Sequence, residues 1–172
     1  MGNIKLIVPA KEYAEQVMNY RQEFINNNEE IHGDGGLSKF DNFDEWLNYN
    51  TNNEKEETVT KGYVPANTYL AIENDKMVGI INIRHCLNDF LLNYGGHIGY
   101  SVRKSERQKG YAKQMLKLAL ERCKELNIER ALLTCDKNNI GSVKTIISNG
   151  GILENEVIEN DKTTQRYWID LK

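Results

Sequence analysis

One strand-helix-strand unit limits the folds open to this chain. A helix over Lys109–Leu126 has apolar residues at spacings of three and four and charged residues on the opposite face. Apolar segments of strand length flank it, Ile98–Val102 before and Ala131–Cys135 after. Two strands joined through a helix form a right-handed parallel crossover. We therefore expect an α/β domain built around this unit.

The rest of the chain supplies antiparallel strands and shorter helices. Further strands are expected at Ile4–Val8, Thr68–Ile72, Met77–Arg84, Ile152–Glu159 and Thr163–Ile169, and helices at Lys11–Asn26, Asp44–Tyr49 and Ser142–Ser148. Asn74-Asp75 and Asn160-Asp161 supply the turns of two hairpins. Residues 87–94 fit either a short helix or an irregular arm. The pattern predicts a mixed, mostly antiparallel central sheet with one parallel crossover, in a single domain spanning residues 1–172.

Composition excludes several classes of protein. The chain has 172 residues, 40% hydrophobic and 27% charged, with a formal net charge of -3. This mild acidity is not the basic footprint of a nucleic-acid binder, and no apolar run approaches the roughly 20 residues that span a membrane. Three cysteines without CxxC spacing argue against a metal site or a disulfide framework. With no signal peptide pattern at the N-terminus, we expect a cytoplasmic protein.

The segment that joins the strand Ile98–Val102 to the long helix has the features of a phosphate-binding turn. The first amides of a helix have no partners inside the helix and carry partial positive charge, so they attract anions. Gly110 allows the backbone to approach the anion closely, and Ala112 stays small beside it. The turn also contains four basic residues, Arg103, Lys104, Arg107 and Lys109. A basic loop that only caps the helix is the alternative interpretation.

These residues resemble the signature of a known family. Gly99-Tyr100-Ser101-Val102 followed by Arg107-Gln108-Lys109-Gly110-Tyr111-Ala112 is similar to the GNAT superfamily of N-acetyltransferases, in which Arg or Gln, two residues, Gly, one residue and then Gly or Ala recur. The order of elements also matches over most of the chain. Gly95–Tyr100 resembles a bacterial branch of predicted acetyltransferases. The resemblance implies a single N-acetyltransferase domain that moves an acetyl group directly from acetyl-coenzyme A (acetyl-CoA) to a primary amine.

The resemblance also implies residues that bind the cofactor. It places the pyrophosphate of coenzyme A on backbone amides of the signature turn, assisted by Arg107; those amides belong to Gln108, Lys109, Gly110, Tyr111 and Ala112. It places the pantetheine arm along the backbone of Tyr100 and Val102. Asn139 and Ser142, after the next strand, are expected beside the same arm. Helix capping is the simpler interpretation of these two residues, and both roles are compatible.

The catalytic groups are less well defined. Many family members carry a tyrosine acid on the following helix, where this chain has Ile146. Tyr100 or a water is expected to replace it, and a thiol with a pKa of about 8.5 leaves tolerably well without help. His97 is a candidate base, but strand alternation turns it away from the face of Val102 and favours a structural histidine. Other candidates are Glu73, His85, Glu154 and a water relay.

Other notable side chains have plain interpretations beside functional ones. Cys135 is expected to be a buried hydrophobe rather than an acyl carrier. Trp46 and Tyr49 are expected in the core, with the lining of an acceptor cleft as the alternative. The acidic residues of one loop could attract a cationic amine, although a solvated loop is the default; they are Glu29, Glu30 and Asp34.

Two other functions compete with the enzyme. A catalytically inactive coenzyme A binding module would explain Ile146 and the lack of an obvious base. A nucleotide-binding protein is less favoured, because the chain has neither a Gly-Lys-Ser/Thr tripeptide nor a dinucleotide glycine pattern. The acceptor, a small-molecule or peptide amine, is left open. A homodimer would be in keeping with the family.

Overall fold

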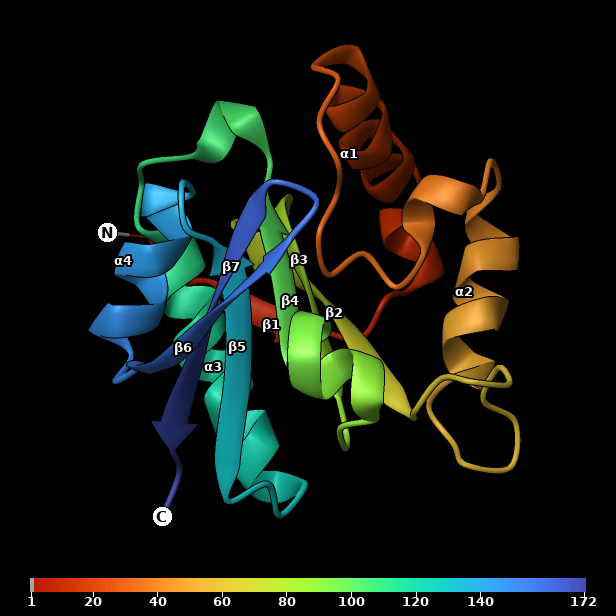
Figure 1. The fold of residues 1–172 in the computed structure, drawn as a ribbon. Helices are drawn as coiled ribbons and strands as arrows, with labels where there is room; N and C mark the ends of the chain where they lie inside the picture. Colours follow the sequence, from red (N-terminus) through yellow and green to blue (C-terminus); the bar gives the residue numbers. More distant parts are fainter. Residues whose placement is uncertain (1) are drawn as a thin grey trace.

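Seven strands form two antiparallel sheets in a computed structural model that describes residues 2–172 (Figure 1). The first sheet has the order β1-β2-β3-β4 and the second the order β5-β7-β6. The first contains β1 (Lys5–Ile7), β2 (Ala66–Glu73), β3 (Lys76–Arg84) and β4 (Ile98–Val102). The second contains β5 (Arg130–Asp136), β6 (Ile152–Glu159) and β7 (Lys162–Asp170).

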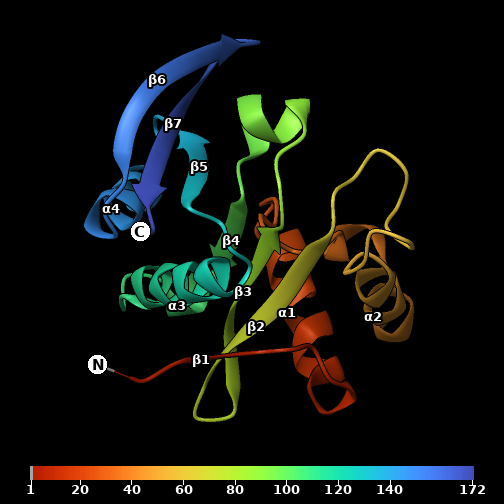
Figure 2. The same ribbon diagram turned by 90° about the horizontal axis from the view of Figure 1, so that it is seen from below.

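Four helices flank the first sheet, two on each side (Figures 1 and 2). Helices α1 (Ala14–Asn26) and α2 (Phe43–Asn52) lie on one side, and α3 (Tyr111–Glu125) and α4 (Ile140–Ser148) on the other. Because strand side chains alternate, β3 contributes to both cores. Ile80 packs with the buried residues of α1 and α2, whereas Ile81 and Ile83 pack with those of α3. This explains why β3 is a nearly continuous apolar run.

Both expected hairpins are confirmed. Asn74 and Asp75 join β2 to β3, and Asn160 and Asp161 join β6 to β7. All four residues have positive φ, at 46°, 63°, 49° and 62° in that order. Two consecutive left-handed residues make a hairpin turn whose twist matches the flanking strands, and Asn and Asp tolerate that conformation better than most residues.

The expected single sheet is divided where β4 meets β5. The strand-helix-strand unit is present as β4-α3-β5, but within residues 2–172 no ladder of hydrogen bonds pairs the two strands. They are joined near their beginnings, where the amide of His97, just before β4, donates to the carbonyl of Leu132 in β5 at 2.7 Å. Beyond this point the strands diverge, and the hydroxyls of Tyr100 in β4 and Ser142 in α4 (Ile140–Ser148) share a hydrogen bond across the gap. The backbones of β4 and β5 therefore form a V with its vertex at His97 (Figure 2).

A short helical arm precedes β4. Leu91–Gly95 forms one wide turn of helix, which resolves the ambiguity of residues 87–94 in favour of a helical segment. Arg166 of β7 donates to the carbonyl of Leu92 at 2.8 Å, and the hydroxyl of Thr134 in β5 donates to the carbonyl of Tyr94 at 2.6 Å. The arm is thus anchored on the second sheet, beside the vertex. No helix of the described residues is long and apolar enough to cross a membrane.

Candidate active site

The backbone of the signature turn has the shape of an anion-binding nest. Gln108 has a φ of 63° and Gly110 a φ of 82°, whereas Lys109 between them is not among the residues with positive φ. Alternation of this kind points successive N–H groups into one concavity, which favours an anion. Helix α3 begins immediately afterwards, at Tyr111, so that its dipole adds to the same field. Gly110 therefore serves the turn through its left-handed conformation as well as its lack of a side chain.

The amides of this turn are not used by the protein itself. From Gln108 to Ala112, no N–H donates to a backbone or side-chain acceptor within residues 2–172. Gly110, which precedes the helix, also provides no side-chain cap. Shortly after this segment, in the first turn of α3, the amide of Gln114 donates to the carbonyl of Gly110 at 3.3 Å. Such a row of free donors at a helix start is suited to a phosphate group.

The basic side chains of the turn are mostly paired, which changes the expected picture of a concentrated positive charge. Arg103 binds Glu23 at 2.6 Å, and Arg107 forms an ion pair with Glu29. Lys109 binds Glu106 at 2.6 Å, and Glu106 is buried although it also pairs with Lys76. Sequence reasoning missed Glu106; its spacing of three residues from Lys109 was the available signal. The pairs leave backbone amides as the main unsatisfied donors.

The outer edge of β4 also offers free backbone groups. The amide of Arg84 donates to the carbonyl of His97, and the amide of Arg103 donates to the carbonyl of Val78. Because bonding alternates along an antiparallel strand, the residues between them that face away from β3 are Ile98, Tyr100 and Val102. The carbonyl of Val102 accepts from Nε of Arg107 at 2.9 Å. The amides of Tyr100 and Val102 thus point into the V, toward the same opening as the turn.

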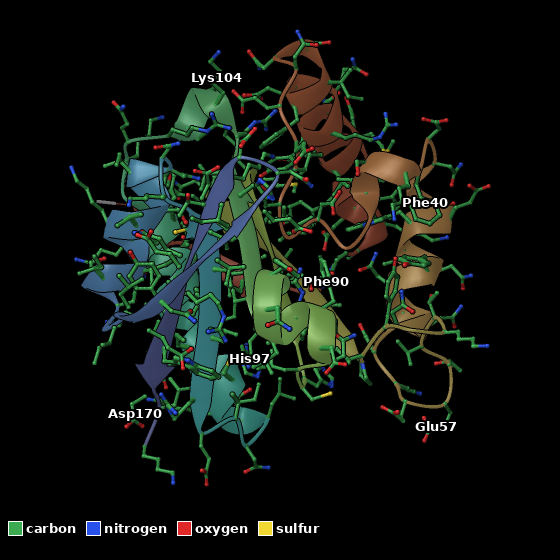
Figure 3. All side chains as sticks on the ribbon, in the orientation of Figure 1. Phe40, Glu57, Phe90, His97, Lys104 and Asp170 are labelled. Carbon is green, nitrogen blue, oxygen red and sulfur yellow. The ribbon has the colours of Figure 1, made fainter. Side chains whose placement is uncertain are left out.

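The V runs from a closed end to an open end. Figure 3 labels His97, just before β4 at the vertex, and Lys104, two residues after the other end of β4. The nest of residues 108–110 lies beyond the mouth, at the start of α3. An extended ligand with an anionic end on the nest could therefore run along β4 toward His97.

Comparison with known proteins identifies the family. The model of the "Acetyltransferase (GNAT) family" matches residues 37–146, which is more than half of the chain. The chain belongs to the GNAT acetyltransferase family. Membership places it among the acetyl-CoA-dependent acetyltransferases, as the signature turn predicted. A search of curated proteins gave no match.

Solved GNAT structures share the fold. The microcin C7 self-immunity acetyltransferase MccE, in complex with acetyl-CoA and AMP, is 19% identical with a TM-score of 0.65, over 97% of this chain and 92% of that one. Mycobacterium smegmatis RimJ, in complex with CoA-disulfide, is 17% identical with a TM-score of 0.72, over 98% and 82%. Vibrio cholerae spermidine N-acetyltransferase, with CoA and spermine, is 14% identical with a TM-score of 0.65, over 98% and 95%. The predicted fold class is confirmed.

In this GNAT chain, Tyr100 reaches across the V. Its hydroxyl lies 2.8 Å from that of Ser142, in the first turn of α4. Burial raises the pKa of Tyr100 to about 12, so the phenol keeps its proton at neutral pH. Burial also raises the pKa of the Cys135 thiol. The buried thiol agrees with the expected hydrophobic role.

Asn139 caps helix α4, as the simpler interpretation predicted. Its side-chain oxygen accepts from the amide of Ser142 at 3.1 Å. The Asn139 side chain is exposed at the end of β5, on the side of the V opposite β4. Its NH2 group is left to donate elsewhere.

The geometry of His97 supports a structural role. Its Nδ1 accepts a hydrogen bond from the amide of Leu132 at 2.9 Å, and its own amide binds the carbonyl of the same residue. The residue is 6% exposed, and burial together with the charge of Arg84 lowers the pKa of His97 to about 4. A neutral imidazole that accepts through Nδ1 holds the two sheets together at the vertex.

The other candidate bases lie in different parts of the molecule. Glu73 accepts a hydrogen bond from the hydroxyl of Tyr111, and Glu154 is held by Arg166 and the indole of Trp168. His85 hydrogen-bonds the side chain of Asn67 at 2.5 Å, and burial lowers the pKa of His85. The structure does not bring these three residues together.

The remaining sequence candidates lie in the core or the loop. Ile146, a residue of α4, is fully buried. Trp46, a residue of α2, is also fully buried, which confirms its interpretation as a core residue. The indole N–H of Trp46 donates to the carbonyl of Asp34 at 3.0 Å and thereby anchors the loop between α1 and α2. Tyr49 is half-buried and packs against Phe40.

Proposed function

We propose that this GNAT chain transfers the acetyl group of acetyl-CoA directly to a primary amine. The observation that carries the proposal is the row of unused amides from Gln108 to Ala112, which opens toward the free edge of β4. The residues fit the pyrophosphate because the nest supplies several N–H donors without a competing side-chain cap. Arg107 contributes by holding the carbonyl of Val102 and so fixing the strand next to the turn.

The pantetheine arm is assigned to the V. The free amides of Tyr100 and Val102 would bind its amide carbonyls, as an added strand would. Asn139 and Ser142 line the opposite wall, where the unused NH2 of Asn139 can donate. When bound, acetyl-CoA supplies the acetyl group as an activated thioester. The amide of Ile98, nearer the vertex, would polarise the thioester carbonyl, and one such donor is worth roughly 2.7–4 kcal/mol in the transition state.

The reaction forms one C–N bond and breaks one C–S bond. The amine must lose a proton. We assign its removal to water rather than to His97, which is neutral and whose Nδ1 already accepts a hydrogen bond from Leu132. The departing sulfur gains a proton, and we assign the donor to Tyr100, with Ser142 holding the phenol in position. Ile146, at the place where many relatives carry the tyrosine acid, is sealed in the core. The phenol of Tyr100, which comes from β4, thus contacts α4, the helix that carries the tyrosine acid in many relatives.

Two measurements test this function. Isothermal titration should give micromolar binding of acetyl-CoA and no binding of ATP at the same concentration, which would exclude the nucleotide-binding alternative. A thiol-release assay with a panel of primary amines should then show acceptor-dependent release of coenzyme A. Binding of acetyl-CoA without thiol release on any amine would instead support the inactive binding module.

A further inference from the structure

A cationic side chain at the vertex has no partner of opposite charge. Nη1 of Arg84 donates to the carbonyls of Gly95 and Gly96 at 3.2 and 3.4 Å, at the end of the helical arm. Within residues 2–172, Arg84 forms no salt bridge, and the carboxylate that influences it is the more distant one of Asp34. Burial lowers the pKa of Arg84 to about 10, so the guanidinium remains charged at neutral pH. A largely buried charge without a counter-ion is costly.

Two side-chain nitrogens of Arg84 have no acceptor among the described residues. One side-chain nitrogen of the described residues, Nε2 of Gln114, is fully shielded from solvent without a hydrogen-bond partner. Nε and Nη2 of Arg84 also lack a protein acceptor, so they must reach solvent. The guanidinium is therefore fixed on one side by backbone carbonyls and presents its other donors outward. A planar fork of this kind matches a carboxylate.

A polar acceptor lies on the same face of β3, two residues earlier. Asn82 is buried, and its NH2 donates to the hydroxyl of Thr68 at 3.0 Å. That hydroxyl donates in turn to Asn50 at 2.7 Å, which fixes the orientation of the Asn82 amide. The Oδ1 of Asn82 accepts nothing from the described residues and is not fully shielded, so it also reaches solvent. Such an oxygen can accept from an amine.

Gly99 brings the two groups close together. Asn82 and Gly99 are paired in the register of β3 and β4, and Nη2 of Arg84 lies 3.2 Å from the position that a Cβ of Gly99 would take. Because Gly99 has no side chain, the guanidinium folds back toward the strand position opposite Asn82. Both groups lie next to Tyr100, whose amide faces the V. The backbone of Gly33 is equally close to this position of Gly99, so the two groups flank the point where the loop meets β4.

The acidic loop offers less to a cationic acceptor than its sequence suggested. The two carboxylate oxygens of Asp34 accept the amides of Gly36 and Ser38, both at 2.9 Å, and Glu29 is paired with Arg107. These acids hold the loop over β4, where Gly33 packs against Gly99. The free charge at the vertex is consequently positive rather than negative.

We propose that the acceptor is a small amino acid, with its carboxylate on Arg84 and its amine on Oδ1 of Asn82. The inference rests on the proposed acetyl transfer and assigns its substrate class. It also explains why a half-buried arginine lacks a carboxylate partner at the place where the acceptor must approach β4.

The test compares free L-amino acids with their carboxamides, which keep the amine and lose the negative charge. Thiol release should favour the free acids by about 100-fold or more in kcat/KM, because a site built for one polar group rejects an analogue that lacks it. Arg84→Gln should abolish that preference by lowering kcat/KM for the acids alone. Arg122→Gln, an exposed arginine paired with Glu125 at the far end of α3, is the matched control and should change neither rate.

A binding measurement separates the two levels of the proposal. Saturation-transfer NMR with the same free amino acids should show contact with the wild-type chain and with Arg122→Gln, and loss of contact with Arg84→Gln. Equal thiol release on acids and carboxamides, or equal loss of both in Arg84→Gln, would overturn the substrate class while leaving acetyl transfer intact. Absence of acetyl-CoA binding would refute the proposed function, whereas amino acid contact that survives Arg84→Gln would refute the site alone.

Discussion

The hydroxyl of Tyr100 lies 2.8 Å from the hydroxyl of Ser142, so one hydrogen bond joins the free edge of β4 to the first turn of α4. This contact lies between the nest and the vertex at His97, where β4 and β5 have separated. It brings a protonated phenol to α4 although the helix itself carries Ile146. A phenol can therefore reach the first turn of α4 from β4, as Tyr100 does here, as well as from α4 itself.

Replacement of Tyr100 by Phe should lower kcat by about 10²-fold or more, because general acid help is worth about 10²–10⁴-fold. The dissociation constant of acetyl-CoA should change less than threefold, since the backbone amide remains. Ser142→Ala should have a smaller effect on kcat, because it removes only the group that positions the phenol. Steady-state kinetics with titration calorimetry would measure both, and an unchanged kcat in Tyr100→Phe would remove it from the mechanism.

Replacement of Gly110 by Val should raise the dissociation constant of acetyl-CoA by at least about 100-fold. The residue has a φ of 82°, so a β-branched side chain strains the turn and displaces the free amides. Gly62→Val is the matched control. Gly62 also has a positive φ, 89°, but a Cβ added there would have no atom within 4 Å, and the residue lies in a loop away from the nest. Both variants should lose a few degrees of melting temperature, but only Gly110→Val should lose the cofactor. Equal affinity in the two variants would contradict the nest.

Protonation of His97 should destabilise the fold in weak acid. The unfolded chain takes up this proton near pH 6.5, whereas burial and Arg84 lower the pKa of His97 to about 4 in the folded chain. Between these values only the unfolded state binds the proton, so the free energy of unfolding falls as the pH decreases. The loss is about 1.4 kcal/mol per pH unit, on the order of 3 kcal/mol in total.

Urea unfolding at several pH values would measure this slope. His97→Gln cannot titrate and should show a flatter dependence between pH 6.5 and 4, after an initial loss of stability at pH 7 from the missing bond to Leu132. Identical slopes in the two proteins would show that His97 is not the group responsible.

Most elements of the fold could be predicted from patterns of residues close together in the sequence. The hairpin turns at Asn74-Asp75 and Asn160-Asp161 and the amphipathic helix α3 each follow from residues close in sequence, and their bounds differ from expectation by only a few residues. The division into two sheets could not be predicted in this way. It depends on a contact between His97 and Leu132, which are 35 residues apart, and strand patterning does not report which edges remain unpaired.

In the candidate site, too, the features made by neighbouring residues could be predicted from the sequence, and the contacts between distant residues could not. The nest could be predicted because Gln108, Gly110 and the start of α3 are contiguous, and backbone conformation is encoded locally. The pairing of Arg107 with Glu29 was not predictable, because it joins residues 78 apart. The exposed donors of Arg84 were invisible for the same reason: a charge at the end of a strand gives no sign of whether an acid folds against it.

Replacement of Ile146 by Tyr, the residue that many relatives have there, should not raise activity. Ile146 is fully buried, and one of its side-chain methyls lies 2.4 Å from the position that a Cβ of Gly151 would take. A larger, polar side chain would overpack this core, at a cost of about 1–3 kcal/mol. Thermal unfolding should show this loss, and kcat should not exceed the wild-type value. Ile147→Tyr, at an exposed neighbouring position, is the control and should leave stability unchanged. A gain in kcat for Ile146→Tyr would place the proton donor on α4 and displace Tyr100.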